Sequence, residues 1–342
     1  MVKDKYNANN TFILAIFLFY ILTMIAGFRP IGFDNDSIGY FQLMKNIIDD
    51  KNDFPVEISF IWIVKSYYYL FGNDYYQRFT LFTFSLINIV LIALALKKLS
   101  KKLLFTIFIY TVLFYPILTL TQIRFGIASA IFLFAIDNIY EKRLFSYLIK
   151  IVAASMFHIS AIILIPVYFL NINKINKFFY IYLFIFSIII PFINDSFIHI
   201  VLYYLDYFPN FIATKVYTYL HFYTEGSSLS SINIFNTFSL FIMGIYLFSL
   251  YNIEKYKSKY AITLVKILGW GIFLYTASSF FPTLSIRILN VFGLVSIILL
   301  AESMYLFKQK TIIYTFICFM LLLIFFNINI RHELLNFGIY YE

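Results

Sequence analysis

Long apolar runs of helix length recur along this chain, and they constrain its fold more than any other feature. A run of about 20 apolar residues can cross the ~30 Å hydrocarbon core of a bilayer as a helix. The runs lie at about 11–28, 79–96, 103–121, 125–140, 178–193, 232–251, 260–280, 288–306 and 311–328. Because 62% of the 342 residues are hydrophobic and only 13% are charged, the chain is a polytopic membrane protein and not a soluble domain.

Two further segments are apolar but do not have the length of one span. Residues 144–170 are too long for a single upright helix and have basic residues before and after them, so we expect this segment to rise and return with a turn near His158. Each limb, with its flanks, has about 16 residues and reaches ~24 Å, which places the turn below the outer surface. Residues 58–72 are short and carry Lys65, so we expect an interfacial or re-entrant helix there.

Basic residues gather between the apolar runs, and in this scheme every cluster falls on the same side. The clusters lie at 97–102, 142–143, 174–177, 255–259 and 308–310. Lys and Arg mark cytoplasmic loops, so the net charge of +9 reports topology and does not indicate nucleic-acid binding. We therefore predict one all-α domain over 1–342, a GT-C-like transmembrane bundle of about 11 spans (10–13) with short or re-entrant helices and amphipathic outer loops.

Three basic residues reach the opposite, outer side: Arg124 in "LTLTQIRFGIASAIFLFAI", His158, and Arg287 in "FPTLSIRILNVFG". An arginine at membrane depth costs at least ~2.5–3.5 kcal/mol, and convergent arginines match phosphate oxygens with their planar fork of donors. We expect these three residues to bind the diphosphate of a lipid whose tail stays in the bilayer. The alternatives are structural: a helix cap or a pair with a buried carboxylate for Arg124, a snorkelling Arg287, and a hydrogen-bonded core His158.

The first outer loop, residues 29–57, is acidic, which suits contacts with sugar hydroxyls beside aromatic rings. We assign Asp34, Tyr40 and Gln122 to the sugar. The second outer loop, 194–231, is amphipathic and rich in tyrosine, and we expect it to lie on the membrane interface as a lid.

Carboxylates of the first outer loop are also candidates for chemistry. Asp36 or Glu57 could act as general base on an acceptor hydroxyl. Asp34 and Asp36 have the D-x-D spacing that can bind a divalent cation through oxygen. The alternative is that the loop is solvated surface. The single cysteine, Cys318, excludes an intrachain disulfide or a multi-thiolate metal site.

The stretch "QIRFGIASAIFLFAI", followed by "KRLFSYLIKIVAASMFHISAIILIPVYFL", resembles the EpsG family of membrane proteins, which is related to Wzy-type polysaccharide polymerases. The family's helix-opening arginine matches Arg124, its basic turn matches 142–143, and its Phe-His-Ser-Ala element matches 157–161. "DSIGY" at 36–40 and Glu57 resemble the first-loop element. In the family a proline often follows the glutamate, whereas here Pro55 precedes it.

This resemblance implies a polymerase that joins repeat units carried on undecaprenyl diphosphate at the outer leaflet of the bacterial cytoplasmic membrane. Arg124 and Arg287 would neutralise the leaving diphosphate, His158 would be a third phosphate ligand or the base, and Asp36 or Glu57 the rival base. No cofactor or metal is required. The implied partners are the lipid-linked oligosaccharide, the bilayer, a chain-length regulator and a flippase.

Two other functions stay open at this stage. A GT-C glycosyltransferase using a polyprenyl monophosphate sugar would make the Asp34/Asp36 pair central and its activity metal-dependent. A transporter or flippase for lipid-linked sugars would need charged groups deep along a pathway. Away from the outer face, only Lys65, Lys150 and Lys266 lie within apolar stretches, which argues against such a pathway.

Overall fold

All regular elements of the described part of the chain are helices, as the apolar runs predict. The computed structural model describes residues 2–51, 56–170, 172–193, 203–204, 207, 233–331 and 334–336. Extended backbone pairs only in one isolated bridge there, between Asp34 and Leu335. Backbone packing divides the chain into two compact units. Unit 1 comprises Met1–Ile172, Lys255–Ala261 and Ile297–Glu342, and unit 2 comprises Asn173–Glu254 and Ile262–Ser296.

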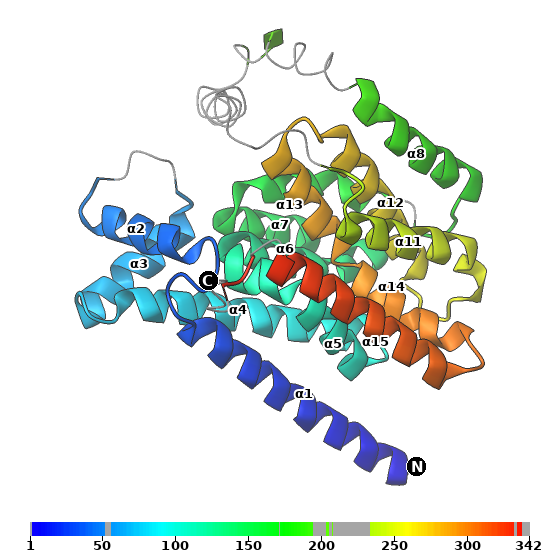
Figure 1. The fold of residues 1–342 in the computed structure, drawn as a ribbon, viewed down its shortest axis with the longest axis horizontal. Helices are drawn as coiled ribbons and strands as arrows, with labels where there is room; N and C mark the ends of the chain where they lie inside the picture. Colours follow the sequence, from blue (N-terminus) through cyan, green and yellow to red (C-terminus); the bar gives the residue numbers. More distant parts are fainter. Residues whose placement is uncertain are drawn as a thin grey trace. The chain divides into compact units, whose positions relative to one another are not determined.

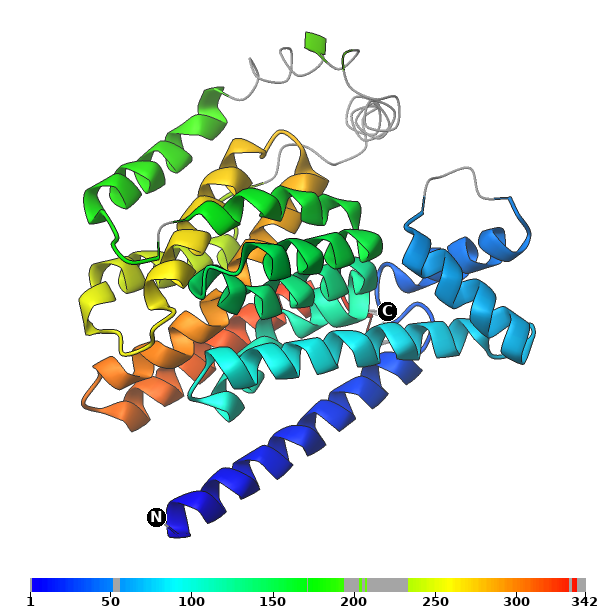
Figure 2. The ribbon, with the colours of Figure 1, turned by 180° about the vertical axis from the view of Figure 1, so that it is seen from behind.

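Unit 1 is built around α6, which is buried on nearly all sides. The α-helices of this unit are α1 (Val2–Phe28), α2 (Ser37–Ile48), α3 (Ile58–Phe71), α4 (Tyr76–Leu99), α5 (Leu103–Leu113), α6 (Ile123–Tyr140), α7 (Leu144–Phe157), α14 (Ser296–Ser303, whose first residue belongs to unit 2) and α15 (Lys310–Phe326). Helix α6 packs against α4 and α7, and α1 packs along α4 (Figure 1, Figure 2). Of the apolar window of α6, 83% is buried, against 11% in α15. Helix α6 is therefore the core of unit 1, and α15 leaves most of its apolar surface for lipid.

Among its described residues, unit 2 contains four longer helices. They are α8 (Lys177–Ile189), α11 (Thr237–Tyr251), α12 (Ala261–Ala277, whose first residue belongs to unit 1) and α13 (Pro282–Gly293). The Tyr246 hydroxyl of α11 donates to the carbonyl of Tyr180 in α8 at 2.9 Å. Gly271 of α12 lies so close to Phe292 of α13 that a Cβ atom there would be 2.2 Å from its Cβ. These contacts join α8 to α11 and α12 to α13.

The helices occur at the positions of the predicted spans, but most are short. Four described helices are long and apolar enough to cross a membrane: Tyr76–Leu99, Ile123–Tyr140, Pro282–Leu306 and Lys310–Ile330. A fifth is added if the bent pair Leu103–Leu113 and Tyr115–Thr121 counts as one span. Seven further apolar helices have 10–17 residues, which is shorter than a typical membrane-spanning helix of about 20 residues. Helix length thus supports four or five of the 11 predicted spans directly.

The predicted run 103–121 is broken by a proline. Helix α5 ends at Leu113, and a π-helical turn over Tyr115–Thr121 continues at 67° to it. Pro116 has no backbone N–H, and its ring clashes with the carbonyl four residues earlier, so the α-helix cannot continue through it. The bend carries the chain to the start of α6.

The predicted reversal at His158 is confirmed. Helix α7 ends at Phe157, His158 is extended (φ −155°, ψ 118°), and a 3-10 helix follows over Ile159–Phe169. The Tyr147 hydroxyl, near the start of α7, donates to the Leu164 carbonyl at 2.6 Å. The two limbs therefore lie side by side as a hairpin, although its return limb is a 3-10 helix and not an α-helix.

The first outer loop contains a helix that the sequence analysis did not predict. Helix α2 buries Ser37, Tyr40, Met44 and Ile47, which recur at helical spacing. The acidic residues around this apolar stripe had concealed the pattern. Most of the second outer loop, 194–231, lies outside the described residues.

Candidate functional site

Arg124, in the first turn of α6, forms the centre of the candidate site. Its Nη1 donates to Oε2 of Glu57 at 2.5 Å, and the two side chains are 22% and 9% exposed. Glu57 is extended and directly precedes α3. The N-terminal end of a helix favours an anion and disfavours a cation. Glu57 is therefore stabilised at the start of α3, and it compensates the unfavourable charge of Arg124 at the start of α6.

Two aromatic rings lie under the guanidinium group of Arg124. Its Cζ is 5.7 Å from the ring centroid of Tyr40 in α2 and 5.4 Å from that of Phe60 in α3. Both rings are buried, and cation–π contacts of this kind stabilise by about 0.5–2 kcal/mol. Helices α2, α3 and α6 thus fix the arginine together.

The aromatic contacts continue from Phe60 toward the turn at His158. The rings of Phe60 and Phe84 are 5.4 Å apart between centroids, and those of Phe84 and Phe157 are 6.0 Å apart. The Ser59 hydroxyl of α3 donates to the Met156 carbonyl of α7 at 2.7 Å. The start of α3 is therefore anchored to the end of α7, one turn from the histidine.

His158 lies against the residue that follows Arg124. Its ring and the ring of Phe125 meet edge to face at 5.2 Å between centroids. Its Nδ1 is 2.7 Å from the Ser160 hydroxyl and accepts the Ser160 backbone N–H at 3.4 Å. His158 is only 7% exposed. Arg124, Glu57, Tyr40 and His158, four of the predicted site residues, thus come together in unit 1.

The guanidinium group retains capacity for an anion. Nε of Arg124 is buried and has no hydrogen-bond partner among the residues that the structure describes. A buried N–H of this kind carries a desolvation cost until a ligand or water accepts from it. The pair with Glu57, one of the structural alternatives expected from the sequence, occupies Nη1 and does not use Nε.

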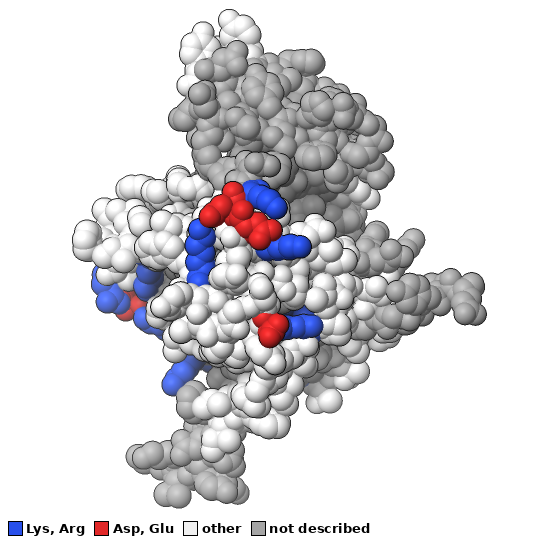
Figure 3. All heavy atoms as spheres, turned by 90° about the vertical axis from the view of Figure 1, so that its left-hand side faces the viewer, with Lys and Arg blue, Asp and Glu red and all other residues white. Residues whose placement is uncertain are grey.

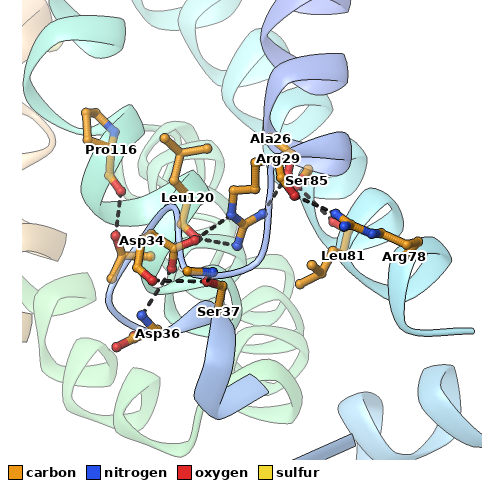
Figure 4. Close-up of polar contacts among 12 residues, drawn as sticks. Ala26, Arg29, Asp34, Asp36, Ser37, Arg78, Leu81, Ser85, Pro116 and Leu120 are labelled. Carbon is orange, nitrogen blue, oxygen red and sulfur yellow. Dashed lines mark hydrogen bonds and ion pairs between the residues drawn. The ribbon is translucent and has the colours of Figure 1, made fainter. Parts of the chain in front are cut away.

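A second arginine network holds the first outer loop beside the start of α6 (Figure 4). Nε of Arg29 donates to Oδ2 of Asp34, Nη1 to the Ala26 carbonyl and Nη2 to the Leu120 carbonyl, each at 2.6 Å. Both charged side chains are almost completely buried, at 1% and 0% exposure. Arg78 of α4 in turn donates to the Arg29 carbonyl at 2.5 Å. Arg29 therefore ties the end of α1 to the π-helical turn that leads into Arg124.

Asp34, which was expected to contact the sugar or to form a cation pair with Asp36, is bound within the protein through its carboxylate. Its Oδ2 is bound by Arg29, and its Oδ1 accepts the Asp36 backbone N–H at 3.1 Å. Both oxygens are used inside the protein because the buried arginine needs a counter-ion. Within the described residues, no three His, Cys, Asp or Glu side chains group closely enough to hold a metal ion.

The other three predicted site residues are Asp36, Gln122 and Arg287. Asp36 directly precedes α2 and is half-buried. It lies one helical turn before Tyr40. Gln122 precedes α6, and its carbonyl accepts the Gly126 N–H at 2.7 Å. Arg287 lies in α13 of unit 2 and is half-buried. It is a member of a different compact unit from Arg124.

The end of unit 1 that carries α2 and α3 bears charges of both signs side by side on an otherwise uncharged surface (Figure 3). Lys65 is 3.0 Å from Asp50, and Lys51 is 3.8 Å from Asp49. These exposed pairs contribute about 0–1 kcal/mol each. Asp49 and Asp50 of the first outer loop are thus each paired with a lysine.

Several residues of the site were not found from the sequence. Phe60 and Phe84 form the aromatic contacts, and Gly126 lets α6 approach the Leu118 carbonyl, where a Cβ atom would be 1.8 Å away. Asn88 donates to the same carbonyl at 3.0 Å. A polar asparagine inside the apolar run 79–96 was the one available signal, because buried polar groups in membrane helices need partners.

The buried α6, the apolar helices around it and the charged residues at its start define a helical protein integral to the membrane. The model of the EpsG family matches residues 12–341. The chain belongs to the EpsG family, and this membership places it among the membrane proteins of polysaccharide biosynthesis. The resemblance drawn from Arg124 and from 157–161 is thereby confirmed. No curated protein and no solved structure matches the chain.

Proposed function

We propose that this protein polymerises oligosaccharide repeat units carried on undecaprenyl diphosphate, at the outer leaflet of the bacterial cytoplasmic membrane. The oxygen of an acceptor hydroxyl forms a bond to the anomeric carbon of the growing chain. The bond between that carbon and the diphosphate oxygen breaks, and undecaprenyl diphosphate leaves with the electron pair. The hydroxyl proton goes to a base. The observation that carries this proposal is Arg124, which Glu57 holds above two aromatic rings. Its Nε is buried and has no hydrogen-bond partner within the described part of the chain.

Arg124 suits the leaving diphosphate because its position is fixed before the ligand arrives. Glu57, Tyr40 and Phe60 hold the guanidinium group, so little reorganisation is needed when negative charge develops. We therefore assign Arg124 to the diphosphate and Glu57 to its positioning. Arg287 is the second proposed diphosphate ligand.

The hydrogen bonds of His158 support a phosphate-binding role for the imidazole. Nδ1 accepts the Ser160 backbone N–H, which assigns the proton of the neutral ring to Nε2. A ring in this tautomer donates from Nε2, which suits a phosphate oxygen better than removal of a proton. We assign His158 as a third phosphate ligand.

Asp36 is then the remaining candidate for the base. Glu57 is committed to Arg124, whereas Asp36 lies one turn before Tyr40, whose ring contacts Arg124. Tyr40 and Gln122 are proposed to contact the sugar. A chain-length regulator and a flippase are the proposed protein partners, and the reaction requires no metal in this scheme.

The test uses the purified protein in nanodiscs with native lipid-linked repeat units and a chelator. Wild type and Lys65→Ala, a matched surface variant beside the site, should both give a ladder of polymer on a gel. Arg124→Ala should give none, and Arg124→Lys should recover little, because lysine lacks the planar fork.

Three results would contradict this proposal. An unchanged ladder from Arg124→Ala would make the arginine structural. A ladder that needs an added divalent cation would favour the metal-dependent glycosyltransferase that uses a polyprenyl monophosphate sugar. Movement of labelled lipid-linked units across the bilayer without polymer formation would favour a flippase.

A further inference from the structure

At the end of α6 far from Arg124, cationic side chains surround one buried carboxylate. Asp137 is 13 residues beyond Arg124, which corresponds to ~20 Å along the helix, and it is 1% exposed. Its Oδ2 is 2.5 Å from Nζ of Lys98 in α4 and 3.4 Å from Nη2 of Arg143. Its Oδ1 accepts from the Tyr260 hydroxyl at 2.6 Å. Both oxygens of Asp137 are thus occupied.

Lys150 of α7 is the third cation near Asp137. Its Nζ donates to Oδ1 of Asn138 at 2.6 Å and lies 4.2 Å from the ring centroid of Phe134. Nζ of Lys98 lies 5.9 Å from the centroid of the same ring. Two ammonium groups therefore share one aromatic ring.

Lys259 supplies the fourth cation. Its Nζ lies 4.8 Å from the ring centroid of Tyr260 and 4.9 Å from that of Tyr140. Tyr260 is the residue whose hydroxyl binds Asp137. Lys98 of α4, Arg143 and Lys150 at the start and in the middle of α7, and Lys259 before α12 form what we call the cation cluster.

The cation cluster has more positive charge than its neighbours neutralise. Its two carboxylates are Asp137 and Glu141, and Glu141 pairs with Arg143. In the part of the chain that the structure describes, Lys150 and Lys259 form no ion pair with a carboxylate. Like charges gathered in this way repel one another, and they do so more strongly near a protein surface than in bulk water. An anion bound here would relieve the repulsion.

We propose that the cation cluster binds the phosphate of an anionic phospholipid. Basic pockets between membrane helices are suited to such headgroups. Directly after Arg143, helix α7 exposes large apolar side chains: Leu144 (41%), Phe145 (78%) and Ile149 (54%). The phosphate would lie among the cations while its acyl chains cover this surface. The lysine distribution assigns this end to the cytoplasmic leaflet, and the inference does not depend on the polymerase activity.

The experiment measures the melting temperature of delipidated full-length protein in detergent. The additives are phosphatidylglycerol, phosphatidylcholine and inorganic phosphate. Phosphatidylglycerol should raise the melting temperature of the wild type by a few degrees, and the other two should not. The shift should be lost in Lys150→Gln/Lys259→Gln and kept in Lys308→Gln/Lys310→Gln, which removes two exposed lysines elsewhere in unit 1.

Without lipid, the Lys150→Gln/Lys259→Gln variant should be at least as stable as the wild type, because the change removes repulsion. An equal shift in this variant and the wild type would overturn the proposal, and so would an equal shift with phosphatidylcholine. A full shift with inorganic phosphate would assign the cluster to a free anion instead. If the double variant does not fold, lipid counts by native mass spectrometry on Lys150→Gln and Lys259→Gln decide: retained phosphatidylglycerol in both refutes the site.

Discussion

Glu57 and Arg124 are 67 residues apart in the chain, and their side chains meet at 2.5 Å between Oε2 and Nη1. Each stands at the beginning of a helix, where the helix dipole favours the glutamate and opposes the arginine. The contact therefore does two things: it compensates a cation in an unfavourable place, and it fixes the direction of the guanidinium group. A carboxylate used in this way serves as a positioning residue.

Glu57→Gln should lower the turnover rate by about one to two orders of magnitude. A hydrogen bond to a charged group is worth about 1.5–3 kcal/mol, and the amide would keep the shape but lose the charge. The pH dependence of the remaining activity should match that of the wild type. A changed pH profile would instead indicate that Glu57 is the base. The control is Glu57→Asp, which retains the negative charge.

Arg29→Met should destabilise the protein by about 3–5 kcal/mol, because it leaves the carboxylate of Asp34 buried without its partner. The double change Arg29→Met/Asp34→Leu should cost less, because no buried charge remains. Thermal unfolding in detergent measures both. Equal losses in the single and double variants would show that the ion pair is not what the substitution disturbs.

Gly126→Ala should destabilise the protein by about 1–3 kcal/mol or more and reduce activity. A Cβ atom there would be 1.8 Å from the Leu118 carbonyl oxygen and 2.4 Å from Nδ2 of Asn88, so the start of α6 must shift. Gly39→Ala in α2 is the matched control, since its Cβ would meet nothing within 4 Å. Equal melting temperatures of the two variants would show that the added Cβ atom at position 126 does not disturb α6.

Ser160→Ala should reduce activity about 2- to 10-fold by removing the hydroxyl that lies 2.7 Å from Nδ1 of His158, a loss of about 0.5–1.5 kcal/mol. Ser160→Thr keeps the hydroxyl and should recover most of the rate. The rate of consumption of lipid-linked units measures the effect. Full activity in Ser160→Ala would show that the imidazole needs no such partner.

Cysteine labelling in intact cells should show the two sides of the membrane. In a Cys318→Ser background, Lys51→Cys should react with an impermeant maleimide added outside, and Lys257→Cys should react only after permeabilisation. Both positions are exposed, so access depends on the side alone. The reverse pattern would invert the topology and place Arg124 at the inner face.

The helix positions and the turn at His158 follow from the sequence, because they depend on local properties. Apolar runs mark the helices, and basic residues at 142–143 and 174–177 require that the segment between them reverses. The bend at Pro116 could also have been predicted from its missing N–H. Helix α2 was not predicted because the acidic residues of this segment suggested a solvated loop and drew attention away from its apolar stripe.

The pairing of charges does not follow from the sequence. Arg29 donates to Leu120, 91 residues away, and Arg124 finds Glu57 across 67 residues. Such partners are brought together by helix packing, and no local periodicity encodes them. For this reason Asp34, which resembles a surface carboxylate in the sequence, proves to be the counter-ion of a buried arginine.

The two limbs of the hairpin at His158 are helices of different kinds. Helix α7 has 14 residues and advances about 1.5 Å per residue, or ~21 Å. The return limb has 11 residues in a 3-10 helix, which advances about 2.0 Å per residue, or ~22 Å. The two limbs match in reach although they differ in length. Rebuilding the return limb as an α-helix would therefore leave it about one turn too short. An engineered version must insert three or four residues to restore the reach of that limb.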